Sequence, residues 1–436
     1  MSLEDNQLGF GKLRGKNMLK NLYTTGVKMI RKGLGFAVNA RKATLRTFRR
    51  LIFAILRTRT KRRPQQIIFE SRRGSGYICN PRDLYESLRD DPRYSSYTFV
   101  WVAQKPKKLA FLQKCPRTRV VKRHSYDYLV AFAQSKYWVA NHMLADYIFP
   151  AKDQVYLQTW HGKPIKRIAA DSAYTVAKGT TGRERRKKYQ RDARKLSWLL
   201  APAPVFAPIM AAAFGLKDGA DDSRLLSAGY PRNVSLFTYT DDDIARLKEK
   251  FDLPCGKKIV LYTPTWRPGK HEKGVGYIYH NPLDFCVLKE ELGDEYILLF
   301  RGHNLEAQSV DLAEYQGFVR DMTSVEDVNE LYLVSDVMIS DYSGTVFDYA
   351  NLRRPMVYYL FDWHEYSVEQ YGTYFDPHTF PGVVAEKEEE LAEAIKTAIS
   401  TITYDEDYKA FNEKFNPWEG VGAPKKLMEQ VFPASE

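Results

Sequence analysis

The sequence predicts an α/β protein in which two Rossmann-like halves face each other across a cleft. Short runs of β-branched and aromatic residues alternate with helical patterns along most of the 436 residues, which is typical of βα units on a parallel sheet. The alternation is interrupted once, by a polar helical stretch from Thr238 to Leu253, and then starts again. The length suits two compact domains with an additional segment, at ~100–200 residues per domain.

The additional segment is an N-terminal arm that holds the excess positive charge. Residues 1–63 contain 17 lysines and arginines against two acids, Glu4 and Asp5, a balance of +15. The net charge of the whole chain is +13, so the rest carries −2. We therefore predict a basic arm at 1–63, a first Rossmann-like domain at 64–236 and a second at 237–436.

The arm contains the pattern of an amphipathic helix between Lys42 and Thr58, where apolar residues recur at helical spacing and arginines fall mostly on other faces. It predicts reversible binding to an anionic membrane surface, peripheral and on the cytoplasmic face. Binding to nucleic acid or another polyanion, and a solvated tail, are the alternatives. No apolar run approaches the ~20 residues that cross a bilayer. The predicted lipid contacts are Arg46, Phe48, Arg49, Arg50, Ile52 and Phe53.

The first half contains seven predicted strands, and in a parallel sheet the chemistry belongs just after the strands, where their carboxyl ends meet. A basic run from Arg183 to Lys195 interrupts this half; it is either a solvated helix face or a contact for lipid phosphates or an acidic acceptor. The strands are Gln66–Glu70, Thr98–Ala103, Arg119–Lys122, Tyr137–Ala140, Val155–Thr159, Trp198–Ala201 and Arg224–Leu226.

The strand Val155–Thr159 is followed by Trp160, His161, Gly162 and Lys163. An imidazole has an unperturbed pKa of ~6.5, so His161 can accept a proton from an alcohol at neutral pH. The alternative is a histidine with a structural role.

The second half repeats the strand pattern and closes with helical material from Lys387 to Val431. Thr265 and Arg267 follow its first strand, and Arg301 and His303 follow its second, separated by one glycine. Such a pair offers donors to a phosphate that can approach closely; an arginine paired with a surface acid is the alternative. The strands are Lys258–Thr263, Tyr296–Arg301, Gly317–Arg320, Val337–Ser340, Pro355–Leu360 and Gly382–Ala385.

The segment from Asp341 to Thr345 is the strongest of these signals. A strand ends, Ser343, Gly344 and Thr345 form a turn, and a helical pattern begins. Hydroxyls and backbone N–H groups at a helix start favour an anion. Helix capping alone is the alternative.

Several common sites are not expected. The nucleotide-binding patterns GxxxxGK[ST] and GxGxxG are absent. The four cysteines are scattered, which supports neither a disulfide framework nor a zinc site and favours a reducing cytoplasm. The acidic clusters Asp221–Asp222 and Asp241–Asp243 adjoin polar helices rather than strand ends, so we expect no metal site; no cofactor is expected either.

Five motifs in order resemble those of the CDP-glycerol glycerophosphotransferases of teichoic acid synthesis. The chain departs from the family pattern at Lys163, where threonine is usual, at Gly344, where serine is common, and at Trp266, where phenylalanine is frequent. The matching segments are QTWHGKPIK from Gln158, AGYPRN from Ala228, YTPTWR from Tyr262, RGH from Arg301, and SDVMISDYSGTVFDYANLRRPMVYY from Ser335.

The resemblance implies a GT-B-like fold whose second domain holds CDP-glycerol and whose first domain carries the acceptor side. It implies His161 as the general base and His303 at the donor diphosphate. Arg301, Ser343 and Thr345 would hold phosphate oxygens, and Asp341 would lie in the donor pocket. The remaining implied substrate contacts are Trp160, Gly162, Lys163, Thr265, Arg267 and Gly344.

The implied reaction transfers glycerol phosphate from CDP-glycerol to a hydroxyl of a lipid-linked teichoic acid or related polymer, with release of CMP. A CDP-ribitol-dependent transferase is the main alternative, and a GT-B glycosyltransferase that uses a nucleotide sugar is a second. A nucleic-acid-binding protein is not expected, because the chain outside the arm is slightly acidic and shows no nucleic-acid-binding motif.

Overall fold

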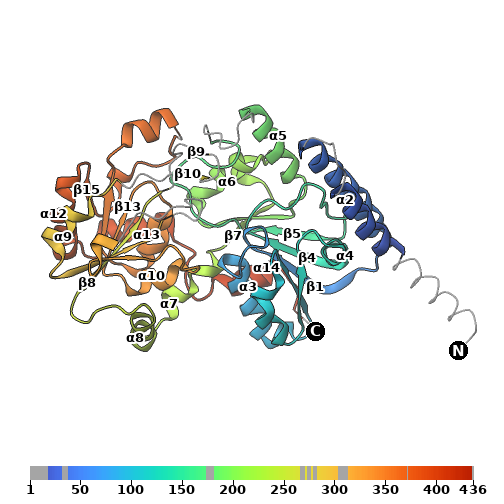
Figure 1. The fold of residues 1–436 in the computed structure, drawn as a ribbon, viewed down its shortest axis with the longest axis horizontal. Helices are drawn as coiled ribbons and strands as arrows, with labels where there is room; N and C mark the ends of the chain where they lie inside the picture. The colour runs from blue at the N-terminus through green and yellow to red at the C-terminus, as the bar shows by residue number, and fades with distance from the viewer. Residues whose placement is uncertain are drawn as a thin grey trace, which may run out of the picture.

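Two parallel sheets, each covered by helices, form the two halves of the computed structural model (Figure 1). The structure describes residues 18–31, 38–172, 181–265, 271–272, 276–277, 282–302, 313–370 and 372–434. The predicted α/β class with two Rossmann-like sheets is confirmed.

The first sheet has seven parallel strands in the order β3-β2-β1-β4-β5-β6-β7. Its central strands are almost wholly buried because helices cover both faces. The strands are β1 (Arg63–Glu70), β2 (Thr98–Ala103), β3 (Thr118–Lys122), β4 (Ser135–Ala140), β5 (Val155–Gln158), β6 (Trp198–Ala201) and β7 (Leu225–Ser227).

The second sheet has six parallel strands in the order β12-β11-β8-β13-β14-β15. A short antiparallel pair, β9 (His271–Glu272) and β10 (Gly276–Tyr277), was not predicted. The sheet strands are β8 (Lys258–Thr263), β11 (Tyr296–Phe300), β12 (Val319–Asp321), β13 (Val337–Ser340), β14 (Met356–Tyr359) and β15 (Val383–Ala385). Each strand predicted from the sequence has a counterpart in one of the two sheets, with small shifts at the ends.

The helices connect the strands and close the two faces of each sheet. In the first half they are α3 (Cys79–Asp90), α4 (Tyr126–Gln134), α5 (Gly182–Ala193) and α6 (Ala207–Phe214). The link between the halves contains α7 (Ser235–Thr238) and α8 (Asp241–Lys250). The second half contains α9 (Phe285–Leu292), α10 (Val328–Val334), α11 (Thr345–Tyr349) and α12 (Leu391–Thr401), followed by α13 (Glu406–Phe415) and α14 (Ala423–Val431).

The two halves share one apolar core at their junction. Phe206 from the first half packs edge-on against Phe347 of α11, with ring centroids 5.5 Å apart. Phe415 of α13 joins them, 5.9 Å from Phe206 and 4.8 Å from Phe347. This aromatic junction brings the carboxyl ends of the two sheets toward a common space.

The last helix, α14, returns to the first sheet (Figure 1). Leu427 and Met428 are buried in the core that contains Ile67 of β1 and Leu84 of α3. The sequence grouped all the helical material from Lys387 to Val431 with the second sheet. That expectation is wrong for α14, because its apolar face packs against the first half and is buried there.

The arm forms a helix at 18–31 and a second helix, α2 (Val38–Arg59). Ile52 and Phe53 are 1% and 2% exposed, because this face of α2 packs on the first half. The expectation that these two residues contact lipid is therefore wrong in this conformation. Phe48 and Arg49 are half-buried, whereas Arg46 and Arg50 are exposed. None of the described helices combines the length and apolar character needed to span a bilayer.

Candidate active site

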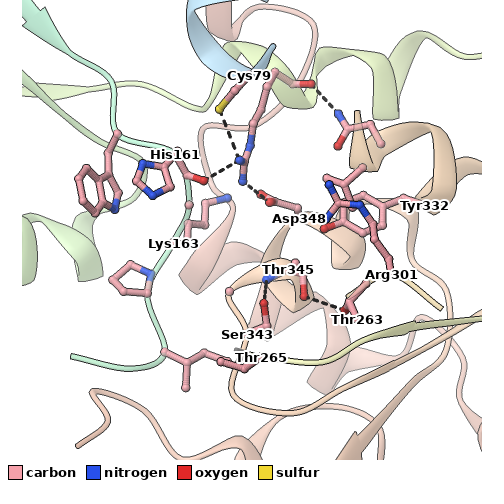
Figure 2. A pocket seen from close by; sticks show the side chains of 18 of the residues that line it. Cys79, His161, Lys163, Thr263, Thr265, Arg301, Tyr332, Ser343, Thr345 and Asp348 are labelled. Carbon is pink, nitrogen blue, oxygen red and sulfur yellow. Dashed lines mark hydrogen bonds and ion pairs between the residues drawn. The ribbon is translucent and has the colours of Figure 1, made fainter. Parts of the chain in front are cut away.

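A cavity of about 360 Å³ lies between the two sheets, where the segments after β5, β8, β11 and β13 converge. Figure 2 shows His161 on one side, Arg301 on the other, and Ser343 and Thr345 between them. The first half contributes the histidine and the second half contributes the hydroxyls and this arginine. The cleft predicted from the two Rossmann-like halves is thus present and joins residues far apart in the chain.

His161 is held in one orientation by the residues around it. Trp160 has a left-handed backbone, with φ of 54°, and its ring centroid lies 4.1 Å from that of His161. The Nδ1 atom of His161 is 2.7 Å from the carbonyl oxygen of Asn141. Because a carbonyl oxygen can only accept, Nδ1 carries the proton and donates it. The neutral ring therefore keeps a lone pair on Nε2, as a general base requires.

The electrostatic surroundings keep His161 neutral. The residue opens to the cavity, but the protein walls around it reduce the solvation of a charged ring, and this lowers its pKa below the ordinary range. The hydrogen bond to Asn141 raises the pKa, while the positive charges of Arg232 and Arg72 lower it. The balance favours the neutral imidazole at pH 7.

Arg232 links the two halves at the base of the cavity. Its Nη1 donates to the carbonyl oxygen of His161 at 2.7 Å, and its Nη2 forms an ion pair with Asp348 of α11. Asn233 donates to the other oxygen of Asp348 at 2.8 Å. Arg232 belongs to the AGYPRN segment, but no role was predicted for Arg232 or Asp348. An Arg and an Asp 116 residues apart carry no local signal of pairing.

Arg301 follows β11 and faces the cavity from the second half. Its Nη2 donates to the carbonyl oxygen of Val325 at 3.3 Å, and its buried Nε has no hydrogen-bond partner among the described residues. Burial lowers the pKa of this guanidinium, yet an arginine stays charged in proteins. No described carboxylate forms an ion pair with it, so a buried positive charge is available to an anion.

Hydroxyl groups line the cavity where β13 ends. The hydroxyl of Thr345 is 3.3 Å from those of Thr263 and Ser340, and Ser343 accepts a hydrogen bond from the Thr345 N–H at 3.4 Å. Figure 2 shows Ser343, Thr345 and Thr263 together on this wall. The predicted Ser343–Gly344–Thr345 turn therefore does line the cavity, with α11 beginning at Thr345.

Gly344 is required by a close approach between the two halves. A Cβ atom at this position would lie 1.8 Å from the carbonyl oxygen of Lys163. Any side chain at 344 would therefore displace the loop that carries His161. Two of the three departures from the family pattern, Lys163 and Gly344, are therefore direct neighbours in space.

Two predicted substrate contacts have other roles. The amine of Lys163 points into the protein, where it lies 2.5 Å from a carboxylate oxygen of Glu419 and 2.5 Å from Asn416. Asp341 is buried and accepts hydrogen bonds from the backbone N–H of Thr265 at 2.9 Å and of Tyr342 at 2.7 Å. Lys163 contributes its backbone to the cavity, and Asp341 holds the loop after β8.

The other predicted positions divide between cavity and undescribed segments. Trp160, Gly162 and Thr265 line the cavity. His303 and Arg267 lie outside the described residues. Most of the basic run lies in helix α5. Among the described residues, no group of three or more His, Cys, Asp or Glu side chains is arranged to hold a metal ion.

Comparison with known proteins gives matches over nearly the whole chain. A family model described as CDP-glycerol:poly(glycerophosphate) glycerophosphotransferase matches residues 52–433. A teichoic acid poly(glycerol phosphate) polymerase of Bacillus subtilis is 35% identical over 402 residues, which are 90% of this chain and 52% of that protein. A teichoic acid glycerol-phosphate transferase of Staphylococcus aureus is 30% identical, over 84% of this chain and 92% of that protein. The chain thus spans about half the length of the Bacillus subtilis relative.

A solved structure has the same architecture. A variant of the wall teichoic acid polymerase TagF superimposes with a TM-score of 0.78 and is 28% identical, over 91% of this chain and 98% of that one. At this coverage, the similarity takes in both halves of the chain.

Proposed function

The chain belongs to the CDP-glycerol:poly(glycerophosphate) glycerophosphotransferase family, and from this premise we propose that it transfers glycerol phosphate from CDP-glycerol to a hydroxyl of a teichoic acid acceptor. The observation that carries the proposal is the cavity itself. It holds a neutral histidine, with its Nε2 lone pair available, opposite a buried arginine and a set of hydroxyls.

In the proposed step, the acceptor hydroxyl donates its proton to Nε2 of His161 and its oxygen attacks the β-phosphorus of CDP-glycerol. The new O–P bond forms while the bond between the β-phosphorus and the bridging oxygen breaks, and CMP leaves with that oxygen. Phosphoryl transfer depends mainly on positioning and on charge stabilisation. Asn141 supports this role, because its carbonyl keeps the His161 proton on Nδ1.

The donor diphosphate is proposed to lie against the second half, where Arg301, Ser343 and Thr345 line the cavity. The buried Nε of Arg301 has no hydrogen-bond partner among the described residues, and the nearby carboxylate of Asp327 forms its ion pair with Arg82. His303 stays a prediction for the same diphosphate. We also propose that these groups offset the donor charge without a metal; a turnover rate that falls on addition of EDTA and returns with a divalent cation would contradict this.

Replacement of His161 by alanine tests the general base. We expect His161→Ala to lose at least roughly 100-fold in turnover, in line with general-base catalysis, while calorimetry shows CDP-glycerol binding close to that of the wild type. His364→Ala is the control, because this exposed histidine lies outside the cavity. Turnover retained by His161→Ala would refute the assignment.

The identity of the donor is tested by parallel incubation with CDP-glycerol, CDP-ribitol and UDP-glucose, with a lipid-linked acceptor analogue. CMP release and product mass report which unit is transferred. We expect CDP-glycerol to be used, since the relatives that align with most of the chain are glycerol-phosphate enzymes. Preferential transfer of ribitol phosphate or of glucose would favour one of the two alternatives.

We propose that the arm attaches the protein to the cytoplasmic side of the membrane. The surface that would contact lipid is the solvent-exposed side of its two helices, which does not pack on the first half. Met18, Leu22 and Met29 of the helix at 18–31 are 69%, 51% and 64% exposed, and Leu51 of α2 is 59% exposed. Exposed basic residues of the same helices, Arg46 and Arg50 of α2 among them, accompany them. Apolar side chains flanked by bases favour an anionic interface.

Deletion of residues 1–63 would not test the attachment cleanly, because it would also remove the buried Ile52 and Phe53. We expect the double variant Leu22→Glu/Met29→Glu to stop sedimenting with phosphatidylglycerol vesicles while it keeps its activity on a soluble acceptor analogue. Val421→Glu, at an apolar residue 65% exposed elsewhere, is the control. Undiminished sedimentation of the double variant would contradict the proposal.

A further inference from the structure

The loop after β1 has an unusual backbone. Arg72 and Arg73 follow each other directly, and both are left-handed, with φ of 43° and 56°. This conformation is strained for a residue with a Cβ atom, so it persists only where the surrounding structure holds it. Two side chains at the end of β4 hold it in place. The N–H of Arg72 donates to Oδ1 of Asn141 at 2.9 Å, and the N–H of Arg73 donates to Nδ1 of His142 at 3.2 Å.

A buried carboxylate supports this loop from below. Because His142 accepts at Nδ1, its Nε2 carries the proton, and it lies 3.3 Å from Oε1 of Glu70. Glu70 is fully buried; burial raises its pKa, but His142 and Arg123 lower it to about 2. Glu70 is therefore an anion at neutral pH. It contacts His142, and His142 in turn accepts a hydrogen bond from the backbone N–H of Arg73.

The loop held by Asn141 and His142 places Arg72 at the cavity, beside the proposed base His161. Arg72 lines the cavity, and its positive charge lowers the pKa of both His161 and Arg301. Asn141 contacts both the segment that carries His161 and the loop that carries Arg72. Its carbonyl oxygen accepts from His161 at 2.7 Å, and its side-chain oxygen accepts from the Arg72 N–H at 2.9 Å. One residue thus sets the positions of the base and of a neighbouring cation.

We propose that Arg72 binds the phosphodiester of the terminal unit of the acceptor, and that Asn141 and His142 are positioning residues for it. The inference rests on the proposed function. When the acceptor hydroxyl lies at His161, the next phosphate of a poly(glycerol phosphate) chain is one three-carbon glycerol away. Arg72 is a cation of the acceptor half at the edge of the same cavity. Arg301, the other cation of this corner, stands on the donor wall.

The test compares two acceptors with the full-length protein: glycerophosphoglycerol, which ends in glycerol and carries the phosphodiester, and an uncharged diglycerol analogue. We expect Arg72→Gln to raise the KM for glycerophosphoglycerol roughly 10- to 100-fold, the range of a charge-assisted hydrogen bond. The rise in the KM for the uncharged acceptor and in the KM for CDP-glycerol should each be at least tenfold smaller than the rise for glycerophosphoglycerol. Arg72→Lys should recover part of the loss.

Arg73→Gln is the matched control, since it removes the same charge from the same left-handed loop at a residue outside the cavity lining. Asn141→Ala provides a second variant. It removes the side-chain acceptor of the Arg72 N–H and leaves the backbone carbonyl that orients His161. We expect it to raise the KM for the charged acceptor while kcat on the uncharged acceptor keeps the wild-type pH profile.

Calorimetry with glycerophosphoglycerol and no donor gives a readout independent of turnover. We expect measurable binding by the wild type and loss of it in Arg72→Gln. Equal loss on both acceptors, a KM change confined to CDP-glycerol, or wild-type calorimetric affinity in Arg72→Gln would each overturn the inference. Absence of CMP release by the wild type with any acceptor would instead refute the proposed function.

Discussion

The buried ion pair between Lys163 and Glu419 gives the sharpest test of how the two halves are joined. The Lys163 amine lies 2.5 Å from the carboxylate, and the two side chains are 0% and 1% exposed. The second oxygen of Glu419 has no hydrogen-bond partner among the described residues. The pair fastens the His161 loop to the segment between α13 and α14.

Replacement of Lys163 by methionine keeps most of the side-chain volume and leaves the Glu419 carboxylate buried without its counter-charge. Breaking a buried pair from one side costs about 3–5 kcal/mol, because the remaining charge has lost its water as well as its partner. Replacement of both residues, Lys163→Met with Glu419→Leu, leaves no buried charge. We expect the double variant to recover more than half of the loss.

Urea unfolding followed by tryptophan fluorescence measures these free energies. Lys250→Met is the matched control, because its ion pair with Glu330 has the same chemistry at 2.6 Å but is 53% and 30% exposed. An exposed pair contributes about 0.2–1 kcal/mol. A loss below about 1 kcal/mol for Lys163→Met, or a double variant as unstable as the sum of the single ones, would refute the reasoning.

Three further outcomes are expected. Gly344→Ala should lose more than roughly tenfold in activity, because its Cβ would lie 1.8 Å from the Lys163 carbonyl oxygen; Gly422→Ala, where a Cβ meets nothing within 4 Å, is the control in the same assay. The activity of the wild type should stay level as pH falls to about 6 and decline only below that, because the lowered pKa of His161 keeps its ring neutral; a midpoint at or above the ordinary histidine pKa would count against it. Burial and neighbouring arginines lower the pKa of His124 to about 3, so stability should be lost as pH falls from about 6.5 toward 3. Thermal unfolding at pH 7 and 5 should show a smaller loss for His124→Gln than for the wild type, and equal losses would refute this.

The positions of the strands along the chain and the position of the proposed base were predictable because both depend on local sequence. Each strand is a short apolar run bounded by turn residues, and His161 follows such a run directly. Parallel strands place their carboxyl ends at one edge of a sheet. For the same reason, Arg301 and Ser343 were predicted to face the cleft, and both line the cavity.

The roles of Lys163, Asp341 and Arg232 were not predictable from their neighbours in the chain. Lys163 pairs with a glutamate 256 residues away, and Arg232 with an aspartate 116 residues away. A charged side chain next to a predicted base has the same local sequence whether its partner is a substrate or a distant carboxylate. Only the folded chain shows which of the two it meets.

The arm shows the same division. Its helical periodicity and its charge are properties of the sequence, and a helix, α2, forms there. Which stripe of that helix turns inward depends on what it packs against, and the first half buries Ile52 and Phe53 while Leu51 stays exposed. The secondary structure, the sheet class and the motif positions could thus be predicted from the sequence, because they follow from short-range periodicity and turn chemistry. The pairing of charges, the choice of the buried apolar face and the packing of α14 depend on the folded chain, because burial and Coulomb energy depend on distances in space rather than along the chain.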